Sequence, residues 1–99
     1  MNEPRLAVEK LETLAQLAMN ARNEVERATI YAAVTALASA LDAESERAVK
    51  YVGENVERAR WHICAMVGYD VTNSLPNDQH LTGALAAIQA LRRAWPHEV

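Results

Sequence analysis

The side chains that could bind a metal ion are few and scattered along the chain. His62 and Cys64 stand two positions apart. On a helix this spacing turns them about 200° from each other, so one ion cannot contact both. Cys64 is the only cysteine, and nothing in the sequence converges on His80 or His97. We therefore expect no metal site.

Two Glu-x-x-Glu pairs have a spacing that could present paired carboxylates to a metal ion in a helical bundle. Glu9 and Glu12 flank Leu11. Glu54 and Glu57 lie in the third expected helix, where Glu54 is well off the apolar positions that we call the valine seam: Val49, Val52, Val56, Ala59, Ile63 and Met66. Ligand carboxylates must project into the bundle, but these positions favour the solvated faces of their helices. We interpret both pairs as surface charges.

An enzyme active site is not indicated either. Small helical enzymes such as chorismate mutases need several inward-pointing cations to hold a dianionic substrate, and Arg60 is the one candidate. The chain contains no Ser-x-x-Lys, Gly-x-Ser-x-Gly, phosphate-binding loop or Cys–His arrangement. We expect no catalytic residues, cofactor or small-molecule substrate, and a small helical enzyme is the third alternative for function.

Nucleic acid is not an expected partner, because acidic and basic residues alternate and the net charge is −3. Basic residues cluster at Arg58 and Arg60 and at Arg92 and Arg93, in each case beside acidic or apolar neighbours. A nucleic-acid-binding transcriptional regulator, with Arg92 and Arg93 as its best residues, is therefore the second alternative.

Length and composition predict the fold class of the chain and its cellular location. Its 99 residues suffice for one helical domain, residues 1–99, and helix-forming residues dominate whereas Gly and Pro are rare. A lone cysteine, the lack of a secretory signal and the lack of an apolar run of about 20 residues predict a cytoplasmic protein without a membrane span. The size fits bacterial or phage origin.

Apolar spacing predicts two helices in the first half of the chain. The first begins near Asn2 or Pro4, and a turn follows around residues 20–24, where Asn23 and Glu26 resemble a capping box. The second runs from about Glu24 to 41. No Gly or Pro enforces the turn, so one continuous helix is the alternative.

Two further helices are expected. Asp42 or Ser45 caps the third, which runs to about residue 67, and Gly68 ends it as a left-handed cap. Asp78 caps the fourth, whose apolar stripe reaches Trp95 before Pro96 ends the helix. The fold class is therefore all-α: a small antiparallel bundle of four helices, or of three if the first two are continuous.

The most informative stretch of the chain is Ala28–Leu41, which contains no charged residue. One side carries a bulky stripe that suits the core of the domain. The opposite side carries an alanine every four residues, a smooth surface that suits a close contact with another helix. We interpret this alanine ridge as a homodimer interface, with packing on the first helix as the alternative. Its residues are Ala28, Ala32, Ala36 and Ala40.

The third helix carries a second candidate surface on the side away from its valine seam. Trp, Tyr and Arg are favoured at the centres of protein interfaces, and a Trp on a solvated face needs cover. We predict a protein-docking surface there, with cover by other helices of the same chain as the alternative. Its residues are Tyr51, Arg58, Trp61 and His62.

These patterns predict a non-enzymatic, small acidic protein-interaction module that acts as an adaptor, regulator or inhibitor. It would dock a helix face on a partner protein and self-associate, with a homodimer as the expected assembly.

Overall fold

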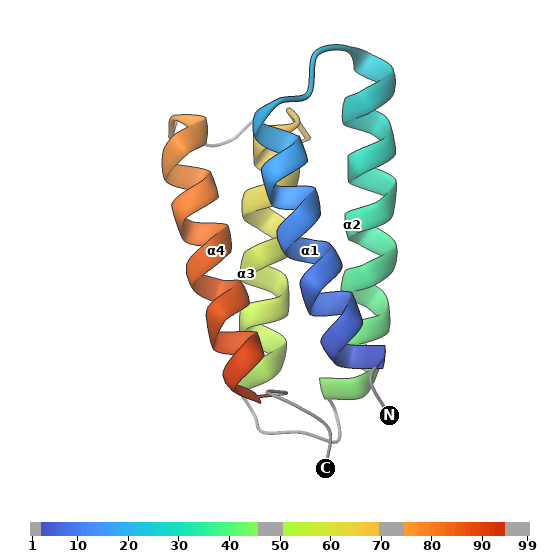
Figure 1. Ribbon diagram of the computed structural model, residues 1–99, viewed down its shortest axis with the longest axis vertical. Helices are drawn as coiled ribbons and strands as arrows, with labels where there is room; N and C mark the ends of the chain where they lie inside the picture. The colour runs from blue at the N-terminus through green and yellow to red at the C-terminus, as the bar shows by residue number, and fades with distance from the viewer. Residues whose placement is uncertain (1–2, 46–50, 70–74, 95–99) are drawn as a thin grey trace.

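Four helices pack side by side in a computed structural model that describes residues 3–45, 51–69 and 75–94 (Figure 1). Successive helices run in opposite directions, so the bundle is antiparallel throughout. This confirms the all-α prediction and excludes the three-helix alternative. The helices are α1 (Glu3–Met19), α2 (Glu24–Ser45), α3 (Tyr51–Met66) and α4 (Asn77–Ala94).

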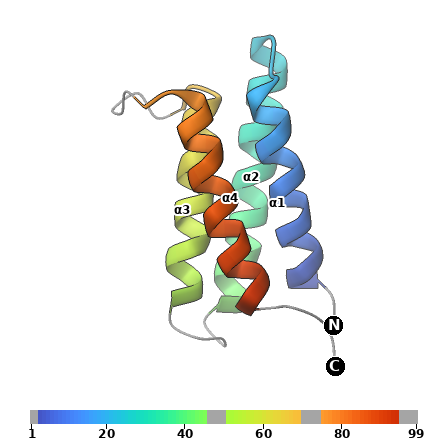
Figure 2. The same ribbon diagram turned by 60° about the vertical axis from the view of Figure 1, so that its left-hand side comes forward.

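Each helix packs against the two helices next to it around the bundle, α1 against α2 and α4, and α3 against α2 and α4 (Figure 2). The α3–α4 contact is the most extensive, and α1 also packs on α4 while α2 packs on α3. Between their described residues, α2 and α4 make no contact. One long side of α2 therefore faces away from the rest of the bundle.

A capping arrangement separates α1 from α2. The backbone N–H of Glu26 donates to Asn23 Oδ1 at 2.9 Å, and the Glu26 carboxylate accepts from the backbone N–H of Arg22 at 2.7 Å. The expected capping box is thus present, although Glu26 reaches the residue before the cap rather than the cap itself. These two bonds stabilise the turn without a Gly or Pro.

Two expected caps are wrong. Asp42 lies inside α2, because that helix continues to Ser45. Asp78 lies in the first turn of α4, where the carbonyl of Pro76 accepts the first helical hydrogen bond from His80 N–H. Acidic side chains also suit the positive end of a helix without being its cap, so residue type alone misplaced this boundary.

Gly68 ends α3 as expected, with a φ of 86°. Its N–H donates to the carbonyl of Ala65, and Tyr69 N–H donates to the carbonyl of Cys64. These bonds form a Schellman motif and satisfy carbonyls that the helix end would leave unpaired. Ser45 ends α2, residues 46–50 lie outside the described part, and so do Trp95 and Pro96.

The core follows the apolar spacing of the sequence. Every helix contributes side chains that are almost fully buried, and α3 contributes an uninterrupted seam. Leu14, Leu37, Leu81 and Leu85 are partly buried at its edges. The largest buried aliphatic side chains are Val8, Leu11, Val34, Leu41, Val52, Val56, Ile63, Ile88 and Leu91.

Candidate protein-interaction surface

The alanine ridge of α2 lies on the surface. Ala28, Ala32, Ala36 and Ala40 are all exposed, and the bulky stripe that begins with Ile30 points into the core. α1 therefore does not cover the ridge, which was the alternative to an interface. The exposed positions between these alanines are also uncharged, because they are Thr29 and Ser39.

The ridge continues onto α1 through a shallow apolar groove. The groove follows the seam between the two helices and has a volume of about 440 Å³, and its lining residues are Lys10, Thr13, Leu14, Ala33, Ala36 and Leu37. A second hollow lies at the connection of the two helices, where Leu17 is 51% and Val25 is 75% exposed. We call the ridge, the groove and this hollow together the α1–α2 face.

The predicted docking surface on α3 is divided between exposed and half-buried side chains. The side chain of Tyr51 lies outside the described residues. Arg58 is exposed and donates to Asn55 Oδ1 at 3.2 Å. Trp61 and His62 are half-buried, and both contact His80 of α4. Much of the area that Trp61 and His62 would offer a partner is therefore used inside the chain.

The contact between His62 and His80 corrects the expectation that nothing converges on His80. Their Nδ1 atoms lie 3.0 Å apart, and His80 is only 1% exposed. The two residues are nearly equidistant from the middle of the α3–α4 connection. Such positions face each other in an antiparallel helix pair, which is the signal that a helix-by-helix interpretation missed.

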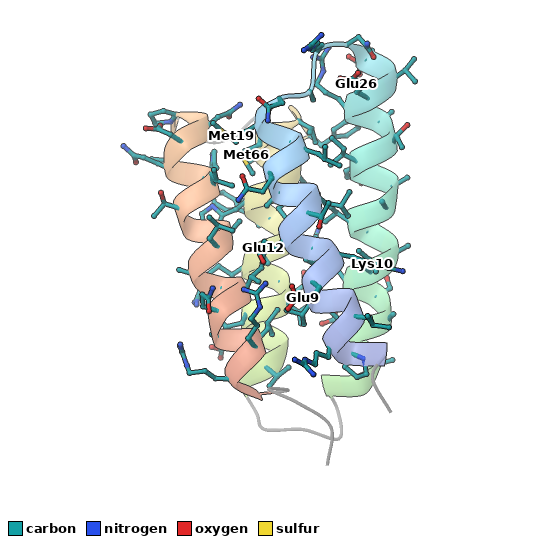
Figure 3. All side chains as sticks on the ribbon, viewed as in Figure 1. Glu9, Lys10, Glu12, Met19, Glu26 and Met66 are labelled. Carbon is teal, nitrogen blue, oxygen red and sulfur yellow. The ribbon has the colours of Figure 1, made fainter. Side chains whose placement is uncertain are left out.

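An ion-pair cluster links α1 to α4. Arg92 Nε and Nη2 donate to the Glu9 carboxylate at 2.9 and 2.8 Å, and Nη2 also contacts Glu12. Figure 3 shows Glu9 and Glu12 between the two helices. The Arg92 hydrogen bond, which outweighs partial desolvation, lowers the pKa of Glu9. Glu9 and Glu12 are thus partnered surface charges rather than purely solvated ones, and Arg92 is engaged by two carboxylates.

A second cluster links α2 to α3. Burial, followed by a hydrogen bond to Glu57 and its negative charge, raises the pKa of Asp42 to about 6. The pKa of Glu57 is lowered, first by the hydrogen bond from Asp42 and then by Arg60, whose Nη2 lies 2.8 Å from Glu57 Oε1. The opposite shifts describe one shared proton. Below a pH of about 6 that proton lies on Asp42, because Arg60 stabilises the ionised form of Glu57.

Neither cluster assembles a metal site. Among the described residues, no three His, Cys, Asp or Glu side chains are grouped closely enough to hold an ion. Within the same residues, no helix is long and apolar enough to cross a membrane.

Comparison with protein-family models, curated protein sequences and solved structures found no match to this chain.

Proposed function

We propose that this chain is a non-enzymatic protein-interaction module, an adaptor, regulator or inhibitor, that docks through the α1–α2 face. One observation supports the proposal above all. The alanine ridge is exposed along α2, and no charged residue interrupts that helix from Ala28 to Leu41.

The physical argument concerns what a surface helix normally presents to water. Charged and polar residues cover its outer face and keep it solvated. α2 instead presents methyl groups and hydroxyls, with Leu17 and Val25 exposed at one end of the same face. Small side chains let a second helix backbone approach closely, which increases the contact area per residue. Such a face favours another helix over water.

The first partner that we propose is a second copy of the chain. The 22 residues of α2 span about 33 Å, and two packed helices are about 20 Å wide. A face of these dimensions would bury about 1,300 Å² in total from two copies, within the range of stable interfaces. Two uncharged ridges are self-complementary, as a two-fold dimer requires.

The test compares one substitution at two exposed alanines. Ala32→Glu puts a carboxylate in the middle of the ridge, and Ala86→Glu puts one on the exposed face of α4, which does not contact α2. Each chain of a symmetric dimer would bury one unpaired charge in the first variant. We expect Ala32→Glu to weaken dimerisation at least about 100-fold, with Ala86→Glu unaffected.

Sedimentation equilibrium over a range of protein concentrations provides the measurement, and circular dichroism checks that both variants keep their helices. A wild-type chain that stays monomeric at every concentration would contradict the proposed homodimer. Equal dimer affinity in the two variants would show that the interface lies elsewhere.

A further inference from the structure

Two histidines from different helices, His62 and His80, lie within hydrogen-bonding distance of each other where α3 packs on α4. The 3.0 Å between His62 Nδ1 and His80 Nδ1 is a hydrogen-bond distance. One nitrogen must therefore carry a proton while the other accepts with its lone pair. The pair keeps this bond with both rings neutral or with one ring charged. When both rings are charged, two donors and two cations face each other, and the bond is lost.

The surrounding side chains hold both rings in place. Trp61 packs edge-on against both, with ring centroids 4.8 Å from His62 and 5.3 Å from His80. On the α4 side, Gly83 lies so close that a Cβ there would be 2.4 Å from His62 Nε2. Because His80 is buried as well, the rings cannot separate without displacing a neighbouring element.

The charges around the pair oppose a second proton. Burial, followed by the positive charges of His80 from α4 and Arg58 from α3, lowers the pKa of His62. The described residues of α1 and α2 contribute no group to this shift.

We propose that His62 and His80 form a proton-sensitive clasp between α3 and α4. Near neutral pH the clasp holds the first turns of α4 on α3. In mild acid the second proton breaks it and loosens this end of the bundle. The inference does not depend on the proposed function, because His62 and His80 lie on α3 and α4 and share no residue with the α1–α2 face.

The direction of the pH effect follows from linkage. A histidine with a lowered pKa in the folded chain stabilises the fold above its unfolded pKa, which is about 6.5. That stabilisation is lost as pH falls below this value. The wild-type urea midpoint should therefore include a decrease between about pH 7 and pH 5 that depends on the pair.

The experiment measures urea midpoints across this pH range for wild type, His62→Gln and His80→Gln. Glutamine offers a side-chain hydrogen bond but does not titrate. The matched control is His97→Gln, at the third histidine of the chain. We expect His97→Gln to keep the difference between the urea midpoints at neutral and acid pH. His62→Gln and His80→Gln should each reduce that difference by at least half. If both keep the full pH dependence of the control, the clasp is refuted.

A second measurement uses the wild-type chain alone and does not depend on the variants folding. An NMR titration of the histidine rings should show two proton-binding steps for the pair, the second at least about tenfold weaker than the first. Two independent titrations near the ordinary histidine pKa would overturn the inference.

Discussion

Replacing Gly83 by alanine gives a sharp test of the α3–α4 packing, because two effects of opposite sign compete there. In the interior of a helix, alanine is more stable than glycine by about 1 kcal/mol. At Gly83, however, the new Cβ would lie 2.4 Å from His62 Nε2, 2.7 Å from Cε1 and 2.8 Å from Cδ2. Atoms at van der Waals contact need about 3.5 Å, so the imidazole must retreat by about 1 Å.

This retreat cannot be made cheaply. Trp61 and His80 both contact the His62 ring, and a shift of this size breaks its 3.0 Å bond to His80. Overpacking costs about 1–3 kcal/mol, and a lost hydrogen bond costs about 1 kcal/mol. After the gain in helix propensity, we expect Gly83→Ala to lower the free energy of unfolding by about 1–3 kcal/mol.

The His62→Ala background reverses the expected sign. Without the imidazole, alanine at position 83 meets no ring and should stabilise α4 by about 1 kcal/mol. A double-mutant cycle from urea unfolding, followed by circular dichroism at neutral pH, measures the coupling between the two positions. If Gly83→Ala has the same effect in both backgrounds, the His62 ring does not occupy the space above Gly83.

The ion-pair clusters give two further predictions. Arg92→Met should lower the free energy of unfolding by about 1 kcal/mol, since its carboxylate partners are partly exposed. Because the pKa of Glu9 is lowered, this loss should shrink in high salt and as pH falls below about 4.5. Asp42→Asn should stabilise the chain by about 1 kcal/mol at neutral pH, the solvent around this partly exposed residue limiting the gain. The Asp42 pKa is raised to about 6, so this gain should appear only as pH rises from about 4 through 6. Urea unfolding across this pH range checks both variants. An Asp42→Asn gain that persists at pH 4 would contradict the shared proton.

The local features of the fold were readable before the structure, because each depends on neighbours in the chain. The spacing of Val52, Val56 and Ile63 indicated a buried helix face, and these side chains are fully buried. Asn23 and Gly68 marked helix ends through bonds that reach only a few residues. Such features have short range, so composition and spacing are enough to predict them.

Contacts between helices needed the tertiary arrangement. The sequence treated Arg92 as a nucleic-acid candidate and Glu9 as a solvated charge, but the packing of α1 on α4 joins them. The packing of α2 on α3 likewise joins Asp42 to Glu57. Helical periodicity specifies the side of a helix on which a residue lies, but not which neighbour that side meets.

Helix propensity and apolar spacing are enough to specify an all-α chain with a buried seam on each helix and an alanine ridge on α2. The packing of the four helices adds that this ridge stays exposed and that His62 contacts His80, with Trp61 packed against both rings. The physical reason is that apolar periodicity constrains the rotation of each helix about its own axis. The order and proximity of helices around the core are set by packing between segments far apart in the chain.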